Sequence, residues 1–318
     1  MSLSDKDKVL IDRLLKGDRA SLARLISKIE DERNGASSIL REITPHTGNS
    51  YILGITGPPG AGKSTFVSSL TALYRKRGRK VGIIAVDPSS PFTGGAVLGD
   101  RIRMQDHTVD KEVFIRSIGS RGSQGGLSKA TAQIAKLYDA FGFDITIIET
   151  VGVGQTELDI IGIADTVIVI LVPESGDVIQ TMKAGLMEIA DIFVVNKADR
   201  EGAEKIAKDI KGITSLAVRE DKWEIPILLT TANKNNGIKE ALDSIEQHRA
   251  FQLEHGLLEQ KARQMREQEL IAIIKENLDS KLREKLKDPQ FNKIVEEVKR
   301  GGLDPYKAAS ELISMLKL

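Results

Sequence analysis

One short run of residues is suited to holding phosphate groups. It reads Gly57-Pro58-Pro59-Gly60-Ala61-Gly62-Lys63-Ser64, fits the pattern GxxxxGK[ST] in full, and continues into Thr65. Small residues let successive backbone N–H groups turn inward around phosphate oxygens, where a Cβ would obstruct them. In such a loop the lysine reaches the β- and γ-phosphates, and the serine hydroxyl ligates Mg²⁺. The run, Thr65 included, therefore predicts a nucleotide-binding loop with its magnesium ion; an accidental glycine-rich turn is the alternative.

A second motif, Asn196-Lys197-Ala198-Asp199, indicates which base is bound. An aspartate accepts two parallel hydrogen bonds from the N1–H and 2-amino groups of guanine, a donor pair that adenine lacks. The asparagine amide can serve N7, and the lysine stem can cover the ring. Thr231 and Ala232 follow the last strand expected in the core, where the Ala232 N–H would reach O6; an ordinary strand end is the alternative for this pair. The motif predicts that the nucleotide is GTP or GDP.

Three carboxylates are candidates for the magnesium shell, together with the Ser64 hydroxyl. They are Asp87 after the apolar run 81–86, Asp100 after the glycine-rich stretch 89–99, and Glu149 after the apolar run 145–148. Nucleotide-bound Mg²⁺ keeps several waters, so one or two of these carboxylates would act through water. The alternative is a set of turn or helix-capping residues, which the dipeptide Asp87-Pro88 favours for Asp87. We take Lys63, Asp100 and Glu149 as the catalytic candidates.

The group that orients the attacking water is not evident in the sequence. Where the commonest GTPases carry DxxGQ, this chain reads Glu149-Thr150-Val151-Gly152-Val153, and a valine cannot orient water. Gln155 lies two positions further on. Four arginines are candidates, by position only, for stabilising the transferred charge: Arg101, Arg103, Arg116 and Arg121. Because positioning the water is a main task in phosphoryl transfer, we expect slow hydrolysis by the isolated protein.

The order of apolar segments predicts which elements position these residues. Residues 1–49 carry apolar side chains at helical spacing, which favours two or three helices ahead of the core. Between 50 and 250, short apolar runs alternate with amphipathic stretches, the pattern of an α/β fold with a mainly parallel, doubly wound sheet. From 251 to 318 strand signals disappear, and leucine or isoleucine recurs every four residues from Leu270 to Leu286. The expected organisation is a helical extension, a P-loop NTPase core and a helical arm.

Composition limits the classes of partner. The 318 residues carry 46 Lys and Arg against 45 Asp and Glu, a net charge of +1, which gives no reason to expect nucleic acid or an anionic membrane. The chain contains no cysteine, so disulfides and thiolate metal sites are excluded. The apolar run 167–172 is too short to span a bilayer, and the first residues form no secretory h-region. We expect a cytoplasmic protein.

Several motifs together are more specific than the phosphate loop alone. They are the runs 57–64, Ala85-Val86-Asp87-Pro88-Ser89-Ser90, Leu98-Gly99-Asp100-Arg101-Ile102-Arg103-Met104, 149–155 and 196–199. In this combination the chain resembles the MeaB/ArgK-type GTPases over nearly its whole length. That family comprises the G-protein chaperones of methylmalonyl-CoA mutase and related cobalamin-dependent acyl-CoA mutases.

The resemblance implies a homodimeric GTPase that gates delivery of adenosylcobalamin to an acyl-CoA mutase, of methylmalonyl-CoA or isobutyryl-CoA type, and protects that mutase. It implies that the C-terminal arm serves dimerisation. It also implies that Gln155, and Gln180 and Lys183 within Glu174–Met187, relay the nucleotide state to the partner. Taken from the residues alone, 174–187 is a loop and helix start, and a solvated face is an equal interpretation.

Two other functions compete with the chaperone. A metal-insertion GTPase would need clusters of cysteine and histidine, but the chain has no cysteine and four scattered histidines. A kinase or an ATPase linked to amino-acid transport is opposed by the guanine motif 196–199. It stays open, because an eight-residue phosphate motif cannot separate a hydrolase from a kinase.

Overall fold

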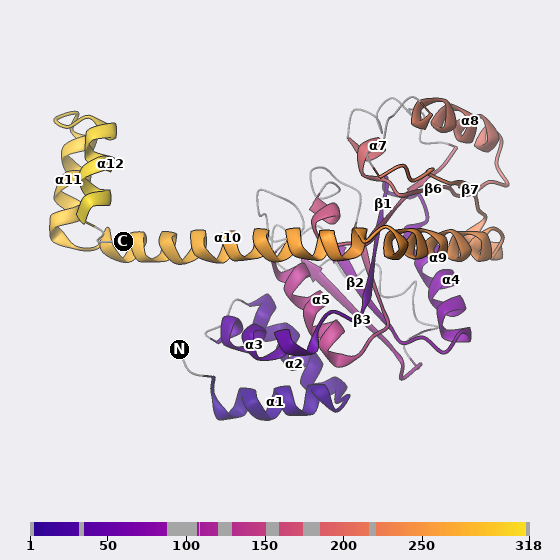
Figure 1. Ribbon diagram of the computed structural model, residues 1–318, viewed down its shortest axis with the longest axis horizontal. Coiled ribbons are helices and arrows are strands. Elements are labelled where there is room, and N and C mark those ends of the chain that lie inside the picture. Colours follow the sequence, from indigo (N-terminus) through magenta and orange to yellow (C-terminus); the bar gives the residue numbers. More distant parts are fainter. Residues whose placement is uncertain are drawn as a thin grey trace. The chain divides into compact units, whose positions relative to one another are not determined.

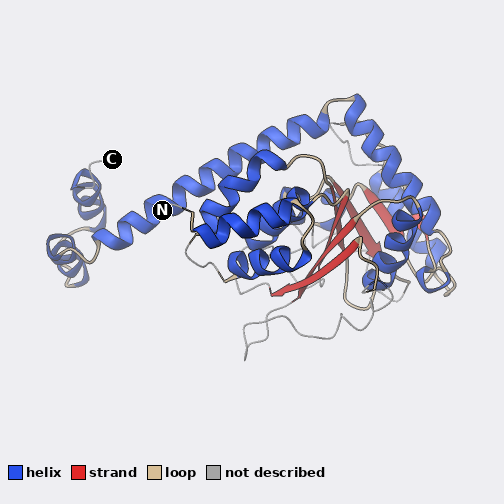
Figure 2. Ribbon diagram, turned by 90° about the horizontal axis from the view of Figure 1, so that it is seen from below, coloured by secondary structure: helices blue, strands red, loops and turns tan. Residues whose placement is uncertain are grey.

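The computed structural model describes residues 3–31, 35–87, 107, 109–119, 129–150, 159–173, 185–215 and 221–315. The chain divides into two compact units, Met1–His255 and Gly256–Leu318. The first unit holds the sheet and the second is helical, as the ribbon views show (Figures 1 and 2). The three-part division at 49/50 and 250/251 remains an interpretation of the sequence, and α9 (Ile238–Glu254) runs across the second of these limits.

The first unit is built on a seven-stranded sheet with the order β3-β2-β4-β1-β5-β6-β7. The strands are β1 (Tyr51–Thr56), β2 (Val81–Asp87), β3 (Val113–Gly119), β4 (Ile145–Thr150), β5 (Thr166–Leu171), β6 (Ile192–Val195) and β7 (Ile227–Leu229). Every pairing between these strands is parallel. Strands β4, β5 and β6 are buried throughout, as expected for a parallel sheet covered on both faces. The predicted P-loop NTPase fold is confirmed.

Helices cover both faces of the sheet. They are α4 (Lys63–Lys76), α5 (Lys129–Phe141), α7 (Leu186–Ile189), α8 (Ala203–Thr214) and α9, with the short 3₁₀ turns η4 (Asp159–Gly162) and η5 (Ala232–Lys234). Helices α4 and α9 pack against each other, whereas α5 packs on β2 and β4. Alternate β2 residues, Ile84 and Val86, join the apolar cluster that α5 shares with the N-terminal helices. Because side chains alternate along a strand, Ile84 and Val86 mark the face of the sheet that α5 covers.

The N-terminal extension forms three helices, α1 (Asp5–Leu15), α2 (Arg19–Glu30) and α3 (Ala36–Ile43), followed by η1 (Thr44–His46). The side chains of Ser4 and Asp18 cap the first two helices by accepting hydrogen bonds from backbone N–H groups. The apolar faces pack on α5, and α2 is also tied to β3, where Arg116 pairs with Glu30 at 2.6 Å. The extension is therefore part of the first unit's core.

The second unit consists of α10 (Leu257–Lys285), α11 (Pro289–Lys299) and α12 (Pro305–Met315). No residue of α10 is buried, and Leu270, Ile274 and Leu278 are 57%, 47% and 40% exposed. Helices α11 and α12 pack together, with Phe291 and Ala308 buried. In the part of the chain that the structure describes, no helix combines the length and the apolar character needed to cross a bilayer.

Candidate functional site

The phosphate loop leaves the sheet at the carboxyl end of β1, where the strand order reverses between β4 and β5. This is the point at which parallel α/β sheets bind ligands. Gly57, Gly60 and Gly62 have φ angles of +136°, +76° and +85°. A Cβ on Gly57 would lie 2.0 Å from the Ile170 carbonyl oxygen, and one on Gly62 would lie 2.5 Å from Asn196 Nδ2. Side chains are therefore excluded at both positions, and only glycine lets the loop pack this closely against β5 and Asn196.

The side chain of the loop lysine folds back onto the backbone of the loop. Lys63 Nζ donates hydrogen bonds to the Gly57 and Pro58 carbonyl oxygens at 2.8 and 3.0 Å, and the residue is only 6% exposed. A buried ammonium group needs such acceptors. These contacts hold the charge at the mouth of the loop, beside the first turn of α4, where an anionic phosphate is also favoured by the helix N-terminus.

Two of the magnesium candidates meet at the end of the sheet. Ser64 Oγ donates a hydrogen bond of 2.7 Å to Glu149 Oε1, and the two residues are 6% and 4% exposed. Glu149 is the penultimate residue of β4 and pairs with Ile55 of the strand that leads into the loop. A hydroxyl and a carboxylate oxygen are the hard ligands that Mg²⁺ prefers, so the donor set fits this ion. Clusters of three or more His, Asp or Glu side chains able to hold a metal do not occur among the described residues.

The base motif lies against the phosphate loop. Asn196, 3% exposed, donates from Nδ2 to the Ala61 carbonyl oxygen at 2.8 Å. Its Oδ1 accepts hydrogen bonds from Thr230 Oγ1 and the Ala232 N–H, both at 3.1 Å. The Asn196 amide thereby joins the phosphate loop to the segment after β7. The Ala232 N–H already donates to Asn196 Oδ1. It could also donate to a guanine O6 only if the two oxygens shared this hydrogen.

The other two members of the motif are more exposed. Asp199 is 42% exposed, and its Oδ2 accepts a hydrogen bond from Lys234 Nζ at 3.0 Å. This hydrogen bond holds the pKa of the Asp199 carboxyl below its usual range. Lys197 adopts φ +57°, a left-handed conformation that is uncommon outside glycine and typical of functional turns.

One residue of the site follows no motif. Ser69 of α4 donates from Oγ to the Ala232 carbonyl oxygen at 3.0 Å and ties the base segment to the helix that begins at the phosphate loop. That segment is closed by a bridge between Thr231 and Asn236. The contact could not be read from the sequence, since a serine in mid-helix most often bonds within its own turn or faces water.

Several predicted residues fall outside the described part of the chain: Asp100, Gln155, Gln180 and Lys183. Asp87 ends β2 with its backbone paired to Gly119, but its side chain also lies outside the description. Among the four candidate arginines only Arg116 is described, and it is bound to Glu30 and Ser27 of α2. That pairing assigns Arg116 to the attachment of the N-terminal extension.

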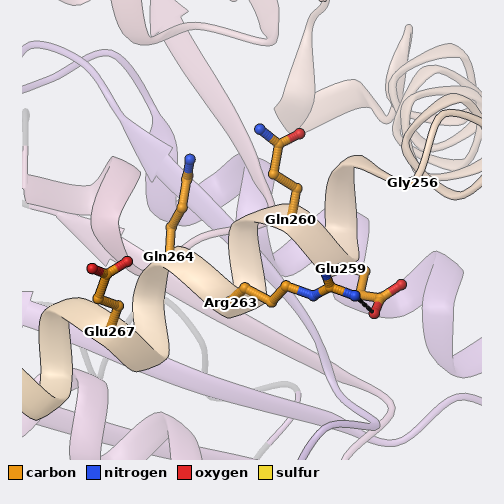
Figure 3. A pocket seen from close by; sticks show the side chains of 6 residues that line it. All are labelled: Gly256, Glu259, Gln260, Arg263, Gln264 and Glu267. Carbon is orange, nitrogen blue, oxygen red and sulfur yellow. Dashed lines mark hydrogen bonds and ion pairs between the residues drawn. The ribbon is translucent and has the colours of Figure 1, made fainter.

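The second unit carries a shallow hollow of its own. It lies along the first turns of α10 and is lined by Gly256, Glu259, Gln260, Arg263, Gln264 and Glu267 (Figure 3). Glu259 and Arg263 form an ion pair there with side chains 69% and 71% exposed. An open, single-helix surface of this kind has none of the concavity expected of a ligand site.

Known proteins match this chain along most of its length. The family described as methylmalonyl-CoA mutase-associated GTPase MeaB matches residues 22–287. A provisionally named GTPase of Pyrococcus abyssi is 50% identical over 307 residues, covering 96% of this chain and 95% of that protein. The GTPase ArgK of Escherichia coli is 39% identical over 258 residues, 79% of this chain and 78% of its own.

A mammalian relative and a solved structure extend the comparison. The mitochondrial methylmalonic aciduria type A homolog of Mus musculus is 31% identical over 339 residues, which covers 99% of this chain and 81% of that protein. A solved structure described as an LAO/AO transport system kinase superposes with a TM-score of 0.72 at 28% identity, covering 100% of both chains. The chain belongs to the MeaB family of methylmalonyl-CoA mutase-associated GTPases and is a GTPase.

Proposed function

We propose that this GTPase holds GTP and GDP, with Mg²⁺, between residues 57–65 and the pair of segments 196–199 and 231–232. The observation that carries the proposal is the hydrogen bond from Asn196 Nδ2 to Ala61 O, at 2.8 Å. It sets the guanine motif directly against the phosphate loop, at the edge of the sheet where nucleotides bind in this fold. Family membership supports the same nucleotide.

The chain's own residues suggest how phosphoryl transfer is assisted. Lys63 and the backbone N–H groups of the loop would bind the β- and γ-phosphates and stabilise charge that develops on their oxygens. Ser64 and Glu149 would hold Mg²⁺, which supplies further neutralisation of phosphate charge when bound; Asp87 and Asp100 complete the proposed shell. We assign catalytic roles to Lys63, Asp100 and Glu149. Val153 offers no group to orient water, so slow hydrolysis by the isolated protein follows.

The proposed cellular role is that of a chaperone for a cobalamin-dependent acyl-CoA mutase. In this role the GTPase gates delivery of adenosylcobalamin and protects the mutase, with Gln155, Gln180 and Lys183 relaying the nucleotide state. Support comes from the family description and from the mouse relative, whose name refers to methylmalonic aciduria. We place the protein in the cytoplasm, in keeping with the expectation from sequence.

Hydrolysis measured in single turnovers, alone and with purified methylmalonyl-CoA or isobutyryl-CoA mutase, tests the chaperone role. We expect slow release of phosphate by the GTPase alone and stimulation by the cognate mutase. Gln180→Ala and Lys183→Ala should reduce the stimulation more than the basal rate. Fast hydrolysis without a partner, or indifference to both mutases, would contradict the chaperone role.

We further propose a homodimer formed through the second unit. Leu270, Ile274 and Leu278 follow one another at four-residue steps on α10, so they share one helix face. An exposed apolar stripe of this kind usually marks a protein interface.

Replacing the three stripe residues of α10 by glutamate tests the dimer by light scattering. We expect the mass to fall from two chains to one while GDP binding persists. Ala272→Glu, on the opposite side of α10, is the matched control and should remain dimeric. A monomeric wild-type protein would rule out the proposal.

A second function is suggested by the solved structure described as a transport system kinase. Its test is phosphotransfer from ATP in the presence of cell extract, compared with GTP hydrolysis. The base motif at Asn196 and Asp199 leads us to expect GTP to be used and ATP to be ignored. Efficient turnover of ATP would favour the kinase.

A further inference from the structure

A lysine outside every recognised motif faces the carboxylate that is proposed to select guanine. Lys234 ends η5, and its Nζ donates to Asp199 Oδ2 at 3.0 Å. The side chains are 58% and 42% exposed, so the pair lies at the open rim of the base site. The two residues come from different segments of the chain, one after β6 and the other after β7.

The backbone that carries Lys234 is fixed on several sides. The Lys234 N–H donates to the Thr231 carbonyl oxygen at 2.9 Å, and Asn235 turns the chain with φ +58°. Two residues earlier, Ala232 is held by Asn196 through its N–H and by Ser69 through its carbonyl oxygen. The backbone of Lys234 is therefore constrained by the same contacts that build the base site. Only the side chain of Lys234 spans the remaining distance to Asp199.

We propose that Lys234 is a positioning residue for guanine selection, holding the Asp199 carboxylate in the orientation that receives the N1–H and 2-amino groups. This rests on the proposed guanine site. An ionised carboxylate offers about four lone-pair directions. Lys234 uses one on Oδ2, which leaves the second on Oδ2 and both on Oδ1 for the two donors of the base. The lysine and guanine can thus bind the carboxylate at the same time.

The pair also favours the charge state that guanine requires. A protonated Asp199 would set an O–H donor against a donor of the base. Lys234 keeps the pKa of this carboxyl low. The charged residues next to Asp199 along its own turn are Lys197, Arg200 and Glu201. Because removal of Lys234 lets this pKa rise, the loss of GDP affinity on acidification should begin at a higher pH in its absence.

Affinities of Lys234→Met and Lys234→Arg for GDP and IDP test the proposal. Methionine keeps the stem without the charge, and IDP lacks the 2-amino group. We expect Lys234→Met to weaken GDP about two- to fivefold, within the range of exposed ion pairs, and IDP less. In Lys234→Met, the loss of GDP affinity on acidification should begin at a higher pH. Lys234→Arg should restore both the GDP affinity and its pH dependence. Lys239→Met, an exposed lysine of α9, is the control and should bind as the wild type does.

Asp199→Asn, measured alone and combined with Lys234→Met, separates failure of this proposal from failure of the guanine site. If Asp199→Asn leaves GDP affinity unchanged, the guanine site itself is wrong. If Asp199→Asn weakens GDP but Lys234→Met changes neither the GDP/IDP ratio nor the pH profile, Lys234 has no positioning role. Tighter GDP binding by Lys234→Met would also overturn the proposal, because it would mean that the lysine competes with the base.

Discussion

The two halves of the proposed nucleotide site are built differently. In the phosphate half, Lys63, Ser64 and Glu149 are at most 6% exposed and bond to one another or to the loop's own backbone. In the base half, Asp199 and Lys234 are 42% and 58% exposed and meet across two segments. Asn196 joins the halves through Ala61. Burial strengthens electrostatic contacts, whereas an exposed carboxylate remains accessible to a base and can discriminate between bases.

This contrast implies a division between the two halves: the phosphate half determines how tightly a nucleotide binds, and the base half determines which nucleotide is preferred. Changes in the phosphate half should alter binding and hydrolysis of any nucleotide. Changes in the base half should alter which nucleotide is preferred. The following substitutions test that division, in order of the effect expected.

Asp199→Asn should produce the largest change. The change should be in which nucleotide is preferred rather than in the overall affinity for nucleotides. The amide offers a donor to the 2-oxo group of xanthine and an acceptor to its N1–H, so GDP should weaken and XDP should gain. A site built on hydrogen bonds discriminates by about 10⁴ or more, so the GDP/XDP ratio should fall by a similar order. Competition binding with both nucleotides is the measurement. An unchanged ratio would remove Asp199 from the base site.

Lys63→Ala should lower single-turnover GTP hydrolysis by about 10²–10³, the usual cost of one charge-stabilising donor. Its loss also leaves the Gly57 and Pro58 carbonyl groups without the ammonium they hold. The decrease should be equal for GTP and for XTP in the Asp199→Asn background, since the phosphates are the same. Lys76→Ala, exposed at the far end of α4, is the control. A decrease that depended on the base would break the proposed division.

Glu149→Gln keeps the shape of the side chain and removes its charge beside Ser64. We expect the Mg²⁺ concentration needed for half-maximal hydrolysis to rise by at least about 10–100-fold, which is the cost of changing a residue that only supports a metal ligand. Metal-free GDP binding should change little. Glu240→Gln on the exposed face of α9 is the matched control. If the Mg²⁺ requirement is unaltered, Glu149 is a structural partner of Ser64 only.

The fold could be predicted because most strands are short apolar runs and most of them are separated by amphipathic stretches typical of helices. Strand β3 departs from that pattern: the apolar run 113–115 is followed by Arg116 and Ser117, yet the strand continues to Gly119. The polar residue is tolerated there because Arg116 pairs with Glu30 of α2. A contact between segments so far apart leaves no mark in local sequence.

The same reason limits prediction of the site. The phosphate loop is local, so its residue types and their order indicate its conformation. The base half depends on pairs such as Ser69 with Ala232, 163 positions apart, and Lys234 with Asp199, 35 positions apart. Serine and lysine are common on helices and turns, so neither residue stands out before the fold brings its partner near.

Ser69→Ala should have the smallest effect and is the sharpest test of how the halves are joined. It removes the hydroxyl that holds the Ala232 carbonyl group at 3.0 Å, and one neutral hydrogen bond contributes about 0.5–1.5 kcal/mol. We therefore expect GDP to bind about two- to tenfold more weakly, with pyrophosphate unaffected because it has no base. Ser68→Ala is the control, since the Ser68 hydroxyl contacts His107 instead. Equal weakening of GDP and pyrophosphate by Ser69→Ala would show that Ser69 acts through the phosphate loop, and the two halves would then be one rigid unit.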